Sequence, residues 1–174
     1  VGDLDVNRNF DVIVIGKSAF ADNITITNSD FRNITGVVVK ANAEFEDYGQ
    51  YGAEYITIDS SAFSDIRKGV ADVYRGGRDE STFGPHFRLK SSAFSNVGGE
   101  DAPAFLLHGV QRTEISGNSF AQSGALKINH TVGTPRTIIT GNNFALGTGD
   151  IEAEELNYPG EPRLILGNEA MGMN

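Results

Sequence analysis

The sequence predicts an all-β fold, a right-handed parallel β-helix of about six coils. Two observations carry this prediction. A motif that ends in Phe recurs at intervals of 24 to 32 residues, and a second short apolar run follows it within most units. Repeat periods of about 20 to 50 residues are typical of stacked architectures. The apolar runs are too short, and too closely followed by turns, for helical hairpins, which excludes α-solenoids.

Each copy of the motif joins alternating β-formers to a polar turn, then Ser or Asn, one further residue and Phe. Coils of a β-helix stack about 4.8 Å apart, so equivalent residues of successive copies lie above one another. We therefore expect three ladders inside the solenoid: one aliphatic, one aromatic, and one polar ladder whose side chains form hydrogen bonds along the axis. Their members are Ile26, Ile58, Leu89, Ile115, Ile139 and Ile165; Phe31, Phe63, Phe94, Phe120 and Phe144; and Ser61, Ser92, Asn118, Asn142 and Asn168.

The 174 residues suit a single domain, with repeating coils over 23–170 and an irregular lead-in over 1–22. The alternative is a β-sandwich whose strands are spaced regularly by coincidence. Solenoid ends expose edge strands and need caps. Neither terminus carries an amphipathic cap helix, so we expect the chain to be part of a longer protein.

Composition narrows the classes of partner. The chain has 14 Lys and Arg against 23 Asp and Glu, a net charge of −9, and no cysteine. Disulfide and thiolate chemistry are therefore excluded, and nucleic acid is not expected as a partner because binding phosphates needs a basic face. The apolar runs are far shorter than a bilayer span, so no membrane contact is expected. An acidic polymer could bind only at a local basic cluster.

One dense basic cluster exists, and we predict that it binds the carboxylates of a substrate, because guanidinium groups pair bidentately with carboxylates. The alternatives are an internal ion network with neighbouring acids or a surface for docking another domain. A loop over 44–54 holds Tyr48 and Tyr51 and is followed directly by Tyr55, and these tyrosines either stack on sugar rings or pack over the coil. The predicted binding residues are Tyr74, Arg75, Arg78, Arg88 and Lys90.

The segment Asp72-Val-Tyr-Arg-Gly-Gly-Arg-Asp-Glu-Ser-Thr82, followed by Gly84-Pro85, resembles the C-terminal β-helix of two-domain alginate lyases of polysaccharide lyase family six. The segment from Leu106 to Phe120 is similar to the strand-and-turn signature of the wider family, which includes chondroitinase B. The resemblance spans residues 22 to 170. It implies a bacterial protein, secreted or periplasmic, that acts on alginate.

The resemblance also implies how such enzymes work: a Lys base and an Arg acid about one coil apart, and a calcium ion held by one Asn and a Glu-x-Glu pair. This chain departs from that pattern in every copy. Arg75, Lys90 and His108 are the candidates for catalytic roles, although His108 is equally interpreted as a hydrogen-bonded strand end. Asp150, Glu152 and Glu154 are the candidate calcium ligands, because calcium prefers hard oxygen ligands; a solvated acidic edge is the alternative.

Three hypotheses about function follow. The first is an accessory domain of an alginate lyase, which supports an N-terminal catalytic β-helix and binds the acidic polysaccharide. The second is a self-contained polysaccharide lyase that cleaves uronate polymers by β-elimination. The third is a structural or adhesive β-helix.

Overall fold

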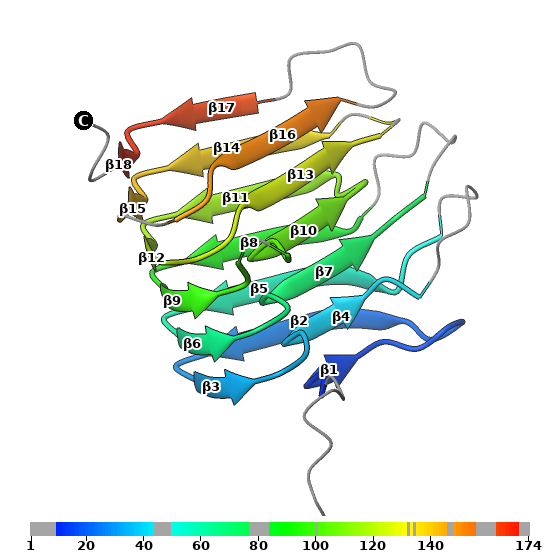
Figure 1. Cartoon of the computed structure of the whole chain (residues 1–174). Coiled ribbons are helices and arrows are strands. Elements are labelled where there is room, and N and C mark those ends of the chain that lie inside the picture. Colours follow the sequence, from blue (N-terminus) through cyan, green and yellow to red (C-terminus); the bar gives the residue numbers. More distant parts are fainter. Residues whose placement is uncertain are drawn as a thin grey trace, which may run out of the picture.

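The computed structural model describes residues 10–43, 50–76, 84–99, 101–131, 133, 135–145, 148–155 and 163–170. Eighteen strands form three sheets of six strands each. Within each sheet, neighbouring strands are parallel. Each strand pairs with the equivalent strand of the adjacent coil, on both sides except at the two edges of the sheet. The chain therefore winds as a parallel β-helix with three sheets (Figure 1), as the sequence predicts, and not as a β-sandwich.

The three sheets take their strands in rotation along the chain. Sheet A consists of β1 (Ile13–Val14), β4 (Val39–Ala41), β7 (Ala71–Tyr74), β10 (Phe105–His108), β13 (Leu126–His130) and β16 (Ile151–Glu155). Sheet B consists of β2 (Ala21–Thr27), β5 (Ala53–Asp59), β8 (His86–Lys90), β11 (Arg112–Ser116), β14 (Arg136–Thr140) and β17 (Arg163–Leu166). Sheet C consists of β3 (Asp30–Ile34), β6 (Ala62–Ile66), β9 (Ala93–Val97), β12 (Ser119–Ala121), β15 (Asn143–Phe144) and β18 (Glu169–Ala170). Within the predicted lead-in, β1 adds to the edge of sheet A by pairing with β4.

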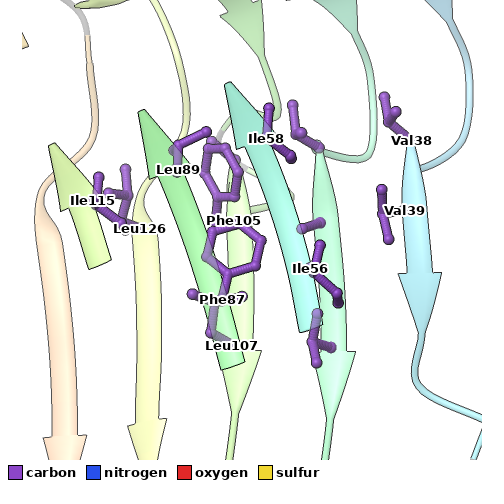
Figure 2. Close-up of a cluster of buried hydrophobic side chains, with 14 of the residues drawn as sticks. Val38, Val39, Ile56, Ile58, Phe87, Leu89, Phe105, Leu107, Ile115 and Leu126 are labelled. Atoms are coloured by element: carbon purple, nitrogen blue, oxygen red, sulfur yellow. The ribbon is translucent and has the colours of Figure 1, made fainter. Parts of the chain in front are cut away.

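The aliphatic ladder occupies the inner face of sheet B. Ile26, Ile58, Leu89, Ile115, Ile139 and Ile165 pair in one register. The first five of these side chains are buried, while that of Ile165 lies outside the described residues. Together with inward side chains of sheet A such as Val39 and Leu107 they fill the middle of the solenoid (Figure 2). Alternation of inward and outward residues along each strand thus produces one continuous core.

The aromatic stack lies on the inner face of sheet C. Phe31, Phe63, Phe94, Phe120 and Phe144 stack in that order, with ring centroids 5.2, 5.0, 4.8 and 4.9 Å apart and interplanar angles of 12° or less. Phe105 of β10 meets the edges of Phe94 and Phe120. The predicted stack is confirmed, and its centroid spacing is close to the distance between coils.

The polar ladder lies in the turn between sheets B and C. The backbone N–H of each ladder residue donates to the side-chain oxygen of its equivalent in the following coil, from Ser29 through Ser61, Ser92, Asn118 and Asn142 to Asn168, at 2.9–3.2 Å. The residue before each ladder position has a positive φ. That residue is Ser60 or Ser91 in two coils and Gly117 or Gly141 in two later ones. Buried turn amides are thereby satisfied without water.

In the part of the chain that the structure describes, no helix is long and apolar enough to span a membrane.

Candidate functional site

The outer face of sheet A carries a pair of aromatic, titratable side chains. Tyr74 at the end of β7 and His108 at the end of β10 are in register. Their rings stack with centroids 4.5 Å apart and an interplanar angle of 7°. Asn129 lies beside His108 on β13. Tyr and His are both able to transfer protons and to stack on sugars, so this row combines the predicted residues Tyr74 and His108 into one surface feature.

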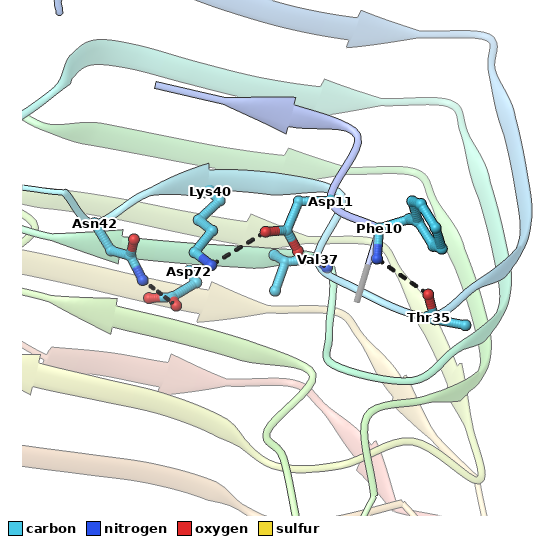
Figure 3. Close-up of polar contacts among 7 residues, drawn as sticks. All are labelled: Phe10, Asp11, Thr35, Val37, Lys40, Asn42 and Asp72. Carbon is cyan, nitrogen blue, oxygen red and sulfur yellow. Dashed lines mark hydrogen bonds and ion pairs between the residues drawn. The ribbon is translucent and has the colours of Figure 1, made fainter. Parts of the chain in front are cut away.

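Acidic groups at the amino-terminal end of sheet A are held by neighbouring side chains (Figure 3). Lys40 Nζ lies 3.1 Å from Asp11 Oδ2, and the Val37 N–H donates to Asp11 Oδ1 at 2.8 Å. Asn42 Nδ2 donates to Asp72 Oδ2. Burial raises the pKa of Asp72 above its usual value, although the hydrogen bond from Asn42 and the charge of Lys40 oppose that rise. These contacts attach the lead-in to the first coils.

Arg75 lies inside the solenoid rather than on its surface. Ala71 and Val73 are the inward residues of β7, and Arg75 continues this alternation directly after the strand. Its exposed fraction is 0%. Its guanidinium carbon lies 6.0 Å from the centroid of the Tyr51 ring, and the Tyr51 hydroxyl donates to Glu54 Oε2 at 2.6 Å. The guanidinium of Arg75 is therefore covered in this structure, whereas the sequence places it at a substrate. A charged residue at the end of a strand has here followed the alternation of the strand into the interior.

The predicted single basic patch is also wrong in its geometry, because its members lie on different faces. Arg88 and Lys90 point outward from β8 of sheet B, whereas Arg75 ends a strand of sheet A. Lys90 pairs in register with Asp59 and Ser116, and His108 belongs to sheet A. Arg78 lies outside the described residues.

Sheet B carries two outward arginines that do not belong to the basic cluster predicted from the sequence. Arg112 and Arg136 are exposed and directly follow His86 in one outward row of the sheet. Tyr55 precedes His86 in the same row, with its ring edge-on to the imidazole at 4.9 Å. Alignment of the repeats would have found these arginines, since each directly precedes the first inward residue of its copy. A hollow of about 170 Å³ lies at this row; Tyr55, Thr57, His86, Arg88, Arg112 and Glu114 line it.

A larger hollow of about 580 Å³ lies between the turn at 98–103 and the outer face of sheet A. Asp101, Gln122, Lys127 and Glu152 contribute its polar side chains. Lys127 Nζ and Glu152 Oε2 form an ion pair at 3.0 Å, with both side chains almost half exposed. The hollow is thus lined by polar side chains, and the charges of Lys127 and Glu152 neutralise each other.

The predicted calcium ligands do not assemble in the described residues. Glu152 is paired with Lys127, and Asp150 is exposed. The side chain of Glu154 lies outside what the structure describes. Tyr48, a candidate for stacking on sugars, also lies outside the described residues. No group of three His, Cys, Asp or Glu residues that could hold a metal ion occurs among the described residues.

These features define a class of protein: a three-sheet parallel β-helix with internal aliphatic, aromatic and amide ladders and with polar, partly basic outer faces. The chain is similar to a solved structure of the polysaccharide lyase family six alginate lyase AlyGC, with 38% identity and a TM-score of 0.90 over 96% of this chain. A variant of AlyGC in which one arginine is replaced by alanine gives 39% identity and a TM-score of 0.81 over 90% of this chain. The resemblance to alginate lyases of that family is thereby confirmed.

The chain spans only 24% and 22% of the length of those two structures. No family model matches the sequence, and no match was found among curated proteins.

Proposed function

We propose that this chain is an accessory, non-catalytic β-helix of an alginate lyase, which supports a separate catalytic β-helix and contacts the acidic polysaccharide. The observation that carries the proposal is the close similarity of nearly the whole chain to about a quarter of AlyGC. Most of an enzyme of that size would lie outside a segment of this length, and the catalytic β-helix is the partner that we assign to the remainder. Since alginate is a large extracellular polymer, we place the protein in the periplasm or outside a bacterial cell.

The arrangement of the three catalytic candidates supports an accessory role. Elimination across a uronate requires a group that neutralises the carboxylate, a base at the α-carbon and an acid at the leaving oxygen, all around one sugar. Arg75 is enclosed in the core, Lys90 lies on sheet B, and His108 lies on sheet A. The separation of these three groups supports an accessory role, because elimination needs all of them around one sugar.

The decisive measurement is the ultraviolet absorbance of unsaturated uronate ends after the chain is mixed with alginate, with and without calcium. We expect no increase in absorbance in either case. A catalytically competent alginate lyase in the same buffer serves as the positive control. Turnover that co-purifies with the chain and is lost in Lys90→Ala or His108→Ala would contradict the accessory role.

The stacked Tyr74 and His108 favour a second candidate, a self-contained lyase. A half-buried Tyr-His pair offers both an acid and a base, with ring centroids 4.5 Å apart. In this alternative the same assay gives turnover, and both Tyr74→Phe and His108→Ala abolish it. Turnover that depends on His108 but not on Lys90 would identify this pair as the site.

A further inference from the structure

The outer face of sheet B presents a straight row of groups suited to a repeating anion. Tyr55, His86, Arg112 and Arg136 occupy the same register on β5, β8, β11 and β14. Neighbouring strands are about 4.8 Å apart, so consecutive members of the row are offset by that distance along the solenoid axis. Arg112 and Arg136 are exposed, and neither forms an ion pair with any residue that the structure describes. Within the described part of the chain, two exposed guanidinium groups without an ion pair therefore stand in register on neighbouring strands.

A second row on the same face frames the first. Arg88 lies directly opposite Glu114 on the next strand, and its Nε lies 3.0 Å from Glu114 Oε2. This ion pair neutralises Arg88, whereas no ion pair joins Arg112, Arg136 or Lys90 of the same face to another described residue. The hollow of about 170 Å³ lies between the two rows.

Tyr55 supplies an aromatic surface at one end of the row. Its exposed fraction is 45%, although a large aromatic ring usually gains from burial. Edge-on contact with His86, with an interplanar angle of 73°, holds the ring against that imidazole. A half-exposed ring in the same row as guanidinium groups can stack on the apolar face of one sugar while the carboxylate of another sugar pairs with Arg.

We propose that this face of sheet B is a binding site for an acidic polysaccharide that runs parallel to the solenoid axis. Carboxylates of sugars along the chain pair with Arg112 and Arg136, and a further ring stacks on Tyr55. The spacing of the coils is of the order of one sugar ring, so a polymer with a charge on each sugar meets cations on successive strands. The net charge of −9 makes a polyanion with denser charge, such as nucleic acid, a worse match. The inference rests on the proposed function only in naming alginate as the polymer.

The test is a titration of alginate oligosaccharides into the purified chain at low salt, followed by calorimetry or by retardation in an alginate-containing gel. The double variant Arg112→Glu/Arg136→Glu should weaken binding by about tenfold or more, since charge-assisted hydrogen bonds are lost and repulsion replaces them. Arg67→Glu is the matched control, because Arg67 is exposed beyond β6 of sheet C and its reversal changes the net charge in the same way as one of the two substitutions. Tyr55→Ala should weaken binding at low and high salt alike. Thermal melting checks that each variant is folded.

Several results would overturn the proposal: no binding of alginate by the unmodified chain, equal binding of neutral dextran, tighter binding of duplex DNA, or an Arg67→Glu loss as large as that of the double variant. An absence of alginate binding would also remove the polymer contact from the proposed function, whereas the non-catalytic role is tested separately by the absorbance assay. Conversely, turnover by the isolated chain would refute the accessory role, while binding could still be tested at this face with the double variant.

Discussion

Asn142 is the position at which the contribution of the polar ladder can be measured. Its side chain is 1% exposed. Its Oδ1 accepts from the Asn118 N–H and from Asn118 Nδ2, both at 2.9 Å. Its Nδ2 donates to the carbonyls of Ile115 and Thr140 at 3.0 and 3.2 Å, and to Asn168 Oδ1 at 2.9 Å. One side chain thus connects three coils.

Asn142→Ala removes all of these contacts and leaves two buried backbone groups without their ladder partner, the Asn118 N–H and the Ile115 carbonyl. Each orphaned group costs about 1–3 kcal/mol, so we expect the free energy of unfolding to fall by about 3 kcal/mol. Asn142→Ser should cost only about 1 kcal/mol. The chain itself shows why: Ser92 Oγ accepts from the Ser61 N–H at 3.1 Å and donates to the Lys90 carbonyl at 2.7 Å, so Ser can complete this turn.

Denaturant unfolding followed by circular dichroism measures both variants, with the slope against denaturant checked for constancy. Asn129→Ala on the outer face of β13 is the control, and its cost should stay within about 0.5 kcal/mol. Equal losses for Asn142→Ala and Asn142→Ser, or a loss below about 1 kcal/mol for Asn142→Ala, would show that the ladder bonds contribute little net stability.

Three further predictions concern the core, a turn and a buried acid. Phe94→Ala should cost about 3–5 kcal/mol by denaturant unfolding, because the ring is buried between two others, whereas the half-buried Phe31 should lose less on truncation; equal losses would contradict this. Ser91→Gly should raise the free energy of unfolding by about 0.5–1 kcal/mol, since Ser91 has a φ of 47°, in the left-handed region that Gly adopts without strain; a lowered melting temperature would refute it. Burial raises the pKa of Asp72, so its carboxylate destabilises the fold above that pKa, and the cost disappears as the pH falls below the ordinary value of 3.8. Asp72→Asn should therefore raise the melting temperature at neutral pH and not in acid, and a gain confined to acid would have the wrong sign.

The ladders could be predicted from the sequence because each is a property of the repeat. Aligning the copies that end at Phe63, Phe94 and Phe120 fixes the register, and the register determines which residues stack. To predict the ladders, it was enough to know that inward and outward residues alternate along each strand and that the distance between coils is constant. The same reasoning explains why the turn ladder tolerates both Ser and Asn.

The basic surface was not predicted, because the residues were grouped by their distance along the chain. Arg75 and Arg88 are close in sequence, but Arg75 is buried at the end of a strand of sheet A, whereas Arg88 points outward from a strand of sheet B. Arg112 and Arg136 are 24 positions apart and adjacent in space. The inward direction of Arg75 was hard to predict because two physical effects conflict there. Burying a guanidinium is costly and favours a place on the surface, whereas the alternation of inward and outward residues along β7 favours the interior.

The turn ladder also has a direction. Every backbone N–H in it is satisfied by the coil that follows, never by the coil that precedes. During synthesis from the amino terminus, each newly added coil therefore completes the hydrogen bonding of the one made before it and carries one unmatched amide of its own. Each added coil therefore moves the open donor to the new carboxyl-terminal end of the ladder. Deleting a coil from the amino-terminal side leaves the ladder amides of the remaining coils matched, whereas deleting one from the other side opens a buried amide.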